Sequence, residues 1–355
     1  MSSFVILGSS NNNSAARRAV FREVVEGSVP NARYLGLDAI FHGGSLPYRV
    51  LTSRRLIASA KKHASLQKLL DRAVSLLYRR EGSINLRPLR PHIPDSEDSY
   101  IIFCPGTRID RVSDAMLQVL RREFPRCHLV SYFVDSIERT AFMNDTDIGT
   151  ILAYLRKFDA AYTYDRADAE AYGDTVQFIE IPLWRASTPA PATPTCELYF
   201  CGHDKNRRGL LLAIYDRLQA AGLRCRYRIV TKVKENHKML GVTLSEWTPY
   251  EVSVSELLTA NCVLEILAAH NQESTLRHKE AVMYNKKFLT TNEAIRDLPY
   301  YDPRWMRTFQ TAEDIDPDWL RAVEPVDYGY RGEYSAETFL RRVEELTPRG
   351  REKGA

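Results

Sequence analysis

Polar side chains gather where an apolar run gives way to a helical pattern in residues 261–292, NCVLEILAAHNQESTLRHKEAVMYNKKFLTTN. The apolar run, Val263 to Ala269, predicts a buried strand, and the apolar spacing that follows it predicts a helix. Between them lie amides, hydroxyls, carboxylates and a guanidinium. The start of a helix presents free N–H groups and the positive end of the helix dipole, so this junction favours an anionic ligand.

Particular side chains at this junction have the chemistry of a nucleotide site. Ser274 or Thr275 can cap the helix. Arg277 offers two parallel donors to a phosphate, and Glu280, one turn further on, can accept hydrogen bonds from ribose hydroxyls. The same spacing is typical of a capped surface helix with solvated charges, so both interpretations stay open at this point.

A second polar junction reads YFCGHDKNRRG at residues 199–209. Gly202 follows an apolar strand pattern and would let a ligand approach the backbone closely. Lys205 and Arg207 follow it and could meet a diphosphate. The stretch is not a P-loop, which requires G-x-x-x-x-G-K-[ST]. The alternative is a basic helix start that faces water, although cations are unfavourable at that end of a helix.

The elements that must position these residues alternate between strand and helix along the chain. The first series has strand patterns at residues 3–8, 100–104 and 128–135, within 158–173 and at 176–183. The second series has strands at 197–202, 225–231, 263–269 and 287–292, and helices at 206–222, 253–260 and 335–346. Ser253 and Glu256 have capping-box spacing. This order predicts parallel sheets with helices on both faces.

A proline-rich stretch, PLWRASTPAPATPTC, separates the two series and favours an extended linker. We therefore expect an N-terminal domain at 1–184, a linker at 185–195, a C-terminal domain at 196–330, and a C-terminal helix and tail at 331–355. Ligands of open α/β sheets bind outside the carboxyl ends of the strands. Two such domains joined by a hinge predict an interdomain cleft.

Composition limits the class of protein. The chain has 355 residues, 44% of them hydrophobic and 26% charged, with a formal net charge of +4, which requires no nucleic-acid partner. Six cysteines without a C-x-x-C pair predict buried free thiols in a reducing compartment. No apolar stretch reaches the roughly 20 residues that cross a bilayer, and the N-terminus lacks the pattern of a signal peptide. We expect a cytoplasmic location.

The two junctions together resemble bacterial GT-B glycosyltransferases that build capsule or lipopolysaccharide. The resemblance runs from about residue 100 to 310, and also includes VDSI at 134–137 and FD--YTYDR-DA--YG at 158–173. The first junction pattern is matched by Tyr199, Gly202, Asp204, Lys205, Arg207, Tyr215, Asp216 and Leu218. The second is matched by Gln272, Thr275, Leu276, Arg277, Glu280, Ala281, Asn285, Lys286, Lys287 and Asn292. Ser274 stands where the family has glycine.

This resemblance implies two Rossmann-like doubly wound α/β domains. The C-terminal domain would bind a nucleotide-sugar donor through Gly202, Lys205, Arg207, Gln272, Ser274, Thr275, Arg277 and Glu280. The N-terminal domain would bind a glycan or lipid-linked acceptor. The resemblance implies no cofactor and no metal, because helix N–H groups and cations offset the leaving-group charge. Two D-x-D triplets, at 145–147 and 314–316, could suggest a metal-dependent enzyme, but neither follows an apolar strand, so solvated loops are favoured.

Two further features concern the acceptor side. Asp135 ends an apolar strand and is our candidate for the general base of an inverting reaction; a helix cap is the alternative. Residues 54–80 carry eight basic residues against Asp71 at amphipathic spacing. Such a helix can lie on anionic lipid, which would add peripheral association with the inner face of the cytoplasmic membrane, or it can pack its apolar stripe on the sheet.

The sequence therefore predicts a metal-independent glycosyltransferase that moves a sugar from a nucleotide-sugar donor to a growing bacterial surface polysaccharide or lipid-linked glycan. A nucleotide-sugar epimerase of the same architecture is one alternative. A non-catalytic sugar-nucleotide-binding partner in polysaccharide assembly is another. Donor sugar, base, acceptor, linkage and stereochemistry do not follow from the residues.

Overall fold

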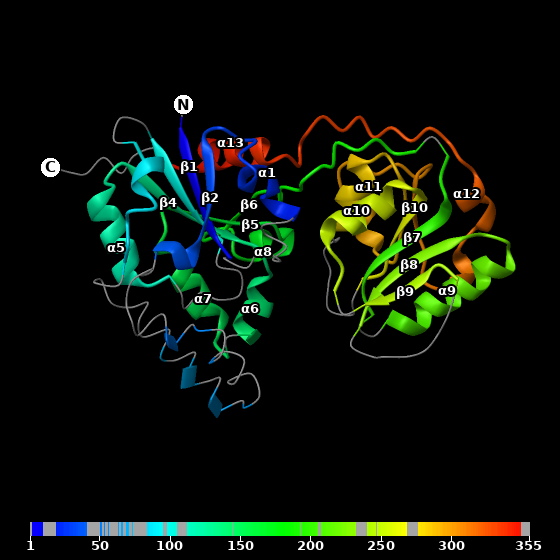
Figure 1. The fold of residues 1–355 in the computed structure, drawn as a ribbon, viewed down its shortest axis with the longest axis horizontal. Helices are drawn as coiled ribbons and strands as arrows, with labels where there is room; N and C mark the ends of the chain where they lie inside the picture. The colour runs from blue at the N-terminus through cyan, green and yellow to red at the C-terminus, as the bar shows by residue number, and fades with distance from the viewer. Residues whose placement is uncertain are drawn as a thin grey trace. The chain divides into compact units, whose positions relative to one another are not determined.

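The structure is a computed structural model (Figure 1). It describes residues 2–9, 19–40, 84–94, 98–104, 112–143, 145–191, 193–204, 207–231, 240–245, 247–267 and 276–348, with scattered residues between 50 and 73. The chain divides into two compact units. Unit 1 contains Met1–Trp184 and Tyr334–Ala355, and unit 2 contains Arg185–Glu333.

Unit 1 is built on a six-stranded sheet in the order β2-β1-β3-β4-β5-β6, with all neighbouring strands parallel. Its strands are β1 (Ser3–Gly8), β2 (Ala32–Gly36), β3 (Ser99–Phe103), β4 (Cys127–Phe133), β5 (Ala160–Thr163) and β6 (Gln177–Phe178). The central strands are continuous apolar runs because a parallel sheet is buried on both faces.

Helices cover both faces of this sheet. They are α1 (Arg22–Val25), α5 (Asp114–Glu123), α6 (Ile137–Met143), α7 (Ile148–Leu155), α8 (Arg166–Ala171) and α13 (Ala336–Leu346), with 3₁₀ turns η2 (Leu37–Ile40) and η4 (Arg90–His92). Helices α5 and α7 pack Met116, Leu120 and Ile151 into one core with β1 and β3. Ser113 begins α5 by accepting a hydrogen bond from the Met116 N–H.

The last helix of the chain belongs to unit 1. The ring of Phe339 on α13 lies 5.5 Å from that of Phe21 and 4.7 Å from that of Tyr132, so α13 lies next to α1 on the sheet (Figure 1). The Tyr162 hydroxyl and the Thr347 hydroxyl are 3.0 Å apart. Burial of a large aromatic side chain contributes about 1.5–3 kcal/mol, so these contacts fix the position of the helix.

Unit 2 repeats the plan with a second all-parallel sheet in the order β12-β11-β10-β7-β8-β9. Its strands are β7 (Cys196–His203), β8 (Cys225–Val230), β9 (Val242–Ser245), β10 (Ala260–Glu265), β11 (Lys287–Thr290) and β12 (Met306–Thr308). Its helices are α9 (Arg208–Ala220), α10 (Tyr250–Leu258), α11 (Leu276–Met283) and α12 (Pro317–Arg321), with 3₁₀ turns η7 (Glu293–Asp297) and η8 (Ala312–Asp314).

The helices of unit 2 also lie on both faces. Leu211 and Leu218 of α9 and Trp319 of α12 pack into one core with β7, β8 and β10. Helices α10 and α11 pack on β7, β10 and β11. Gly222 follows α9 with φ +73°, the left-handed conformation that glycine tolerates, which confirms the predicted end of that helix.

The expected fold class, α/β with two Rossmann-like doubly wound domains, is confirmed by the two parallel sheets. Two local predictions are wrong. The strand predicted at 263–269 is Ala260–Glu265, because the apolar run continues past the last residue that pairs. Ser253 lies inside α10, which begins after Pro249, so Ser253 and Glu256 form no capping box.

Buried free thiols are confirmed at all six cysteines, Cys104, Cys127, Cys196, Cys201, Cys225 and Cys262. No helix in the described part of the chain has the length and apolar character needed to cross a membrane. Most of the predicted amphipathic helix at 54–80 lies outside the described residues.

Candidate functional site

The order of strands in unit 2 creates a switch point between β7 and β10. From β7 the chain moves outward to β8 and β9, and then returns to β10 on the other side of β7. The connections that leave β7 and β10 therefore run in opposite directions along the sheet, and open α/β sheets bind their ligands at such a point. Both polar junctions singled out in the sequence follow these strands.

Arg207 spans this switch point. It precedes α9, and its Nε donates to the carbonyl oxygen of His203 at 2.9 Å, at the end of β7. Its Nη1 donates to the carbonyl oxygen of Ile266, just beyond β10. Its guanidinium carbon lies 5.5 Å from the centre of the Phe200 ring. The Arg207 guanidinium thus links the ends of β7 and β10. Burial lowers the pKa of Arg207.

Gly202 makes room for this arrangement. It is the penultimate residue of β7, and a Cβ at this position would lie 3.3 Å from Arg207 Nη2 and 3.3 Å from Phe200 Cζ. Those separations are tighter than ordinary van der Waals contacts. A side chain at Gly202 would therefore press Arg207 away from the strand end.

Arg277 and Glu280 form an ion pair on the first turn of α11. The Glu280 side chain is fully buried, whereas 17% of the Arg277 side chain is exposed. Burial acts to lower the pKa of Arg277, but the Glu280 carboxylate and the neighbouring thiol and phenol groups together raise that pKa, so Arg277 stays charged. Burial raises the pKa of Glu280, and the Arg277 charge opposes this.

The second oxygen of Glu280, Oε1, is buried and receives no hydrogen bond of ordinary geometry from the described residues. The Tyr250 hydroxyl, at the start of α10, lies near this carboxylate and is buried with it. Burial raises the pKa of Tyr250. The neutral phenol therefore acts on a carboxylate that Arg277 already binds.

Glu265 is a carboxylate at the switch point that the sequence interpretation missed. It is the last residue of β10, is 2% exposed, and accepts a hydrogen bond of 2.8 Å from the Thr290 hydroxyl on β11. Its charge acts on Arg207. An acidic residue that ends an apolar run, as in NCVLE, was the available signal.

The remaining candidate donor residues, Lys205, Gln272, Ser274 and Thr275, lie outside the described residues. Arg277 and Glu280 come together, as do Gly202 and Arg207. The two groups are also close, because the Arg277 charge contributes to the lowered pKa of Arg207.

In unit 1, Asp135 lies beyond the carboxyl end of β4 and is partly exposed. Its Oδ1 accepts from the Ser136 N–H at 3.1 Å, and its Oδ2 lies 3.6 Å from Arg139 Nε. The first turn of α6 has other partners: the Ser136 hydroxyl accepts from Arg139 N–H, and Asp168 Oδ2 accepts from Ile137 N–H at 2.9 Å. Asp135 therefore lies at the sheet edge. Its carboxylate accepts the hydrogen bond from Ser136 N–H and contacts Arg139.

Asp168, on α8, is 5% exposed. Burial raises its pKa to about 7, helped by the negative charges of Asp165, Glu138 and Asp135 and opposed by the hydrogen bond from Ile137. Sequence patterns gave no sign of this group, because its environment is assembled from α6 and α8.

Both D-x-D triplets serve as helix caps. Asp147 accepts from the Thr150 N–H at the start of α7, and Asp316 accepts from the Asp318 N–H at the start of α12. Asp314 accepts from the Thr311 N–H. The described residues contain no group of three or more His, Cys, Asp or Glu side chains suited to a metal ion.

No protein-family model matches this chain, and no curated protein sequence matches it. Solved structures that align with almost all of it include the following three. The glycotransferase of kitacinnamycin is 11% identical, with 98% of this chain and 99% of that chain covered and a TM-score of 0.41. The α,α-trehalose 6-phosphate synthase from Burkholderia multivorans is 8% identical, with 97% and 95% covered and a TM-score of 0.49. The UDP-N-acetylglucosamine 2-epimerase from Rickettsia bellii is 13% identical, with 98% and 97% covered and a TM-score of 0.44.

Proposed function

We propose that this chain is a GT-B glycosyltransferase that moves a sugar from a nucleotide-sugar donor to a growing surface polysaccharide or lipid-linked glycan. The observation that carries the proposal is the convergence of Arg207, Arg277, Glu265 and Glu280 on the switch point of the second sheet. A switch point of this kind is where open α/β sheets bind nucleotides. Two cations suit a diphosphate, and buried carboxylates suit hydroxyl groups.

The donor would lie along the carboxyl ends of β7 and β10. Arg277 keeps donor capacity beyond the one nitrogen that binds Glu280, because a guanidinium carries five N–H groups. The Glu280 carboxylate would accept a hydrogen bond from a ribose hydroxyl. Gly202, Lys205, Gln272, Ser274 and Thr275 complete the proposed donor site on the evidence of the sequence resemblance.

The reaction would proceed without a metal or cofactor. An acceptor hydroxyl oxygen attacks the anomeric carbon, and the bond from that carbon to the donor diphosphate breaks. The electron pair leaves with the diphosphate, whose charge the arginines offset. If the enzyme inverts stereochemistry, the Asp135 carboxylate takes the hydroxyl proton.

The proposal includes the setting of the reaction. Six free thiols are typical of a reducing compartment, which supports a cytoplasmic location. The basic residues at 54–80 support contact with the inner face of an anionic membrane, where a lipid-linked acceptor would be presented.

The first experiment is a thermal-shift screen of nucleoside diphosphates, because a ligand that binds the native state raises the apparent stability. Radiolabelled nucleotide sugars follow, with the base chosen from that screen. Transfer to an acceptor, or slow hydrolysis of the donor, supports a transferase. Interconversion of the free donor would replace it by an epimerase. Binding without turnover would indicate a non-catalytic partner, and no binding at all contradicts every form of the proposal.

A further inference from the structure

A basic groove lies on unit 1 between residues 84–90 and the C-terminal part of α5. It has a volume of about 430 Å³. Ile84, Leu86 and Val119 give it an apolar floor, and Arg87, Arg90 and Arg122 line it together with Glu123. Three of its lining residues are thus cationic and one is anionic, so the described lining carries a net positive charge.

Two of these arginines share one carboxylate. Arg90 Nη2 lies 2.8 Å from Glu123 Oε2, and Arg122 Nε lies 3.6 Å from Glu123 Oε1, so one carboxylate serves two cations. The described residues give Arg87 no carboxylate partner. Arg122 lies in the last turn of α5, where the helix dipole favours a cation. Arg87 and Arg90 lie outside that helix, so the dipole does not account for them.

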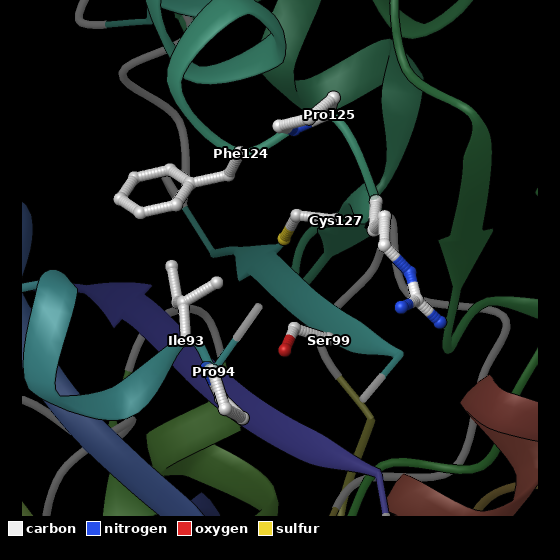
Figure 2. Close-up of a pocket in the computed structure, with 7 residues that line it drawn as sticks. Ile93, Pro94, Ser99, Phe124, Pro125 and Cys127 are labelled. Carbon is white, nitrogen blue, oxygen red and sulfur yellow. The ribbon is translucent and has the colours of Figure 1, made fainter. Parts of the chain in front are cut away.

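A separate pocket of about 180 Å³ lies at the amino edge of the first sheet (Figure 2). Its walls are mainly apolar, with Ile93 and Phe124 among them. Ser99 and Cys127, the first residues of β3 and β4, also line it, and Figure 2 shows both side chains near Ile93 and Phe124. Burial raises the pKa of Cys127 to about 12, so its sulfur remains a thiol and acts as part of the apolar wall.

One polar atom in this pocket is unsatisfied. Ser99 is 2% exposed, and its hydroxyl oxygen has no hydrogen-bond partner among the described residues. A buried hydroxyl without a partner is costly, at about 1–3 kcal/mol.

The groove and the pocket adjoin. Arg90 lines the groove, and its guanidinium carbon lies 5.9 Å from the centre of the Phe124 ring, which lines the pocket. The groove and the pocket are therefore neighbours along residues 84–94 and the end of α5. Asp135 follows the opposite, carboxyl end of β4, so the pocket is distinct from the proposed acceptor chemistry.

We propose that the groove and the pocket together form a binding site for a small amphiphilic anion. Its phosphate or carboxylate group binds the arginines, and its short alkyl or aryl part enters the pocket beside Ser99. An engineered apolar cavity of about 150 Å³ binds benzene, so a pocket of this size holds a group of that order. The inference is independent of the proposed glycosyl transfer.

Calorimetry on the full chain with inorganic phosphate, ethyl phosphate, butyl phosphate and hexyl phosphate tests this site. We expect affinity to rise about fourfold for each methylene group that enters the pocket, and then to level off. Ser99→Ile fills the pocket and should abolish the dependence on chain length while leaving the affinity for inorganic phosphate unchanged. Equal affinity for inorganic and hexyl phosphate in the unmodified chain, or no binding of either, overturns the proposal.

The cationic half has its own variant and control. Arg87→Gln together with Arg90→Gln should weaken hexyl phosphate binding by about fivefold or more, the upper range for exposed charge pairs. Arg156→Gln makes the same type of charge change at the exposed residue that directly follows α7 and should have no effect. Unchanged binding by the double variant would also overturn the proposal.

A vesicle arm distinguishes the two natural sources of such a ligand. Sedimentation with phosphatidic acid vesicles, compared with phosphatidylcholine vesicles, is repeated in the presence of hexyl phosphate. Displacement by hexyl phosphate, and its loss in the double arginine variant, assigns the site to a membrane lipid. Binding of hexyl phosphate without this displacement assigns it to a soluble amphiphile.

Discussion

Arg277 and Glu280 face each other across the first turn of α11, and the Glu280 side chain is fully buried. A buried carboxylate is tolerated when a cation and hydrogen bonds offset its desolvation. The pair therefore has two consequences. It holds a cation at the switch point of the second sheet, and it makes the stability of unit 2 depend on that cation.

Arg277→Ala should lower both nucleotide affinity and stability. We expect nucleotide affinity to fall by about 1.5–3 kcal/mol, the range for hydrogen bonds to a charged group. We expect stability to fall by about 3–5 kcal/mol, because Glu280 is left buried without its partner. Calorimetry with the nucleoside diphosphate and chemical denaturation measure the two effects.

A double variant separates these two effects. Arg277→Met with Glu280→Gln removes both charges and should recover most of the lost stability, since no unpaired charge remains buried. It should not recover nucleotide affinity. Normal affinity in this folded variant would remove both residues from the donor site.

Gly202→Ala should weaken donor binding by displacing Arg207. The added Cβ would lie 3.3 Å from both the guanidinium and the Phe200 ring, so one of them must shift. We expect a stability cost of about 1–3 kcal/mol, the usual range for overpacking. Gly209→Ala is the matched control, because nothing lies within 4 Å of its Cβ on α9 and helical alanine is favoured over glycine by about 0.5–1 kcal/mol. Equal behaviour of the two variants would contradict this account.

Asp135→Asn should separate binding from turnover. The amide keeps an oxygen that can accept from the Ser136 N–H but cannot take a proton from an acceptor hydroxyl. We expect unchanged donor affinity and a loss of turnover of at least about a hundredfold. Near-normal turnover would exclude Asp135 as the base and direct the search to Asp110 and the Asn11–Asn13 loop, both outside the described residues.

His278→Leu should make unit 2 less sensitive to acid. Burial lowers the pKa of His278 to about 3, against an ordinary value of 6.5. The unfolded chain therefore binds a proton below pH 6.5 that the folded chain does not, and stability falls as pH drops from 6.5 towards 3, by up to about 1.4 kcal/mol per pH unit. Denaturant titrations from pH 7 to 4 should show a flatter profile for the variant.

Asp168→Asn should raise the stability of unit 1 at high pH, whereas His278→Leu acts on stability at low pH. The folded pKa of Asp168 is raised to about 7 by burial, so its contribution to stability is greatest below pH 3.8 and is lost as pH rises through 7. The amide oxygen can still accept from Ile137 N–H but does not ionise. We expect the variant to be more stable above pH 7 by roughly 1–2 kcal/mol after solvent screening, with no gain at pH 4. A variant that is less stable at pH 8 would contradict the assigned protonation.

Much of the architecture follows from local patterns in the sequence. Continuous apolar runs such as that of β4 indicate strands buried on both faces, and the glycine at 222 indicates the end of α9, because both depend on nearby residues alone. The two polar junctions were found in the same way, since each directly follows an apolar run. The same kind of pattern, an acidic residue at the end of an apolar run, could have predicted Glu265 as a site residue, but the sequence interpretation missed it.

Only the tertiary structure decides which of these groups meet. Arg207 binds the Ile266 carbonyl because β10 returns to pair with β7, and strand order is a non-local choice that periodicity does not encode. For the same reason the sequence interpretation left residues 331–355 as a separate helix and tail, whereas Phe339 packs with Tyr132 in unit 1. Apolar spacing indicates that a helix has an apolar face to bury. The shape of the folded sheet determines the surface on which that face packs.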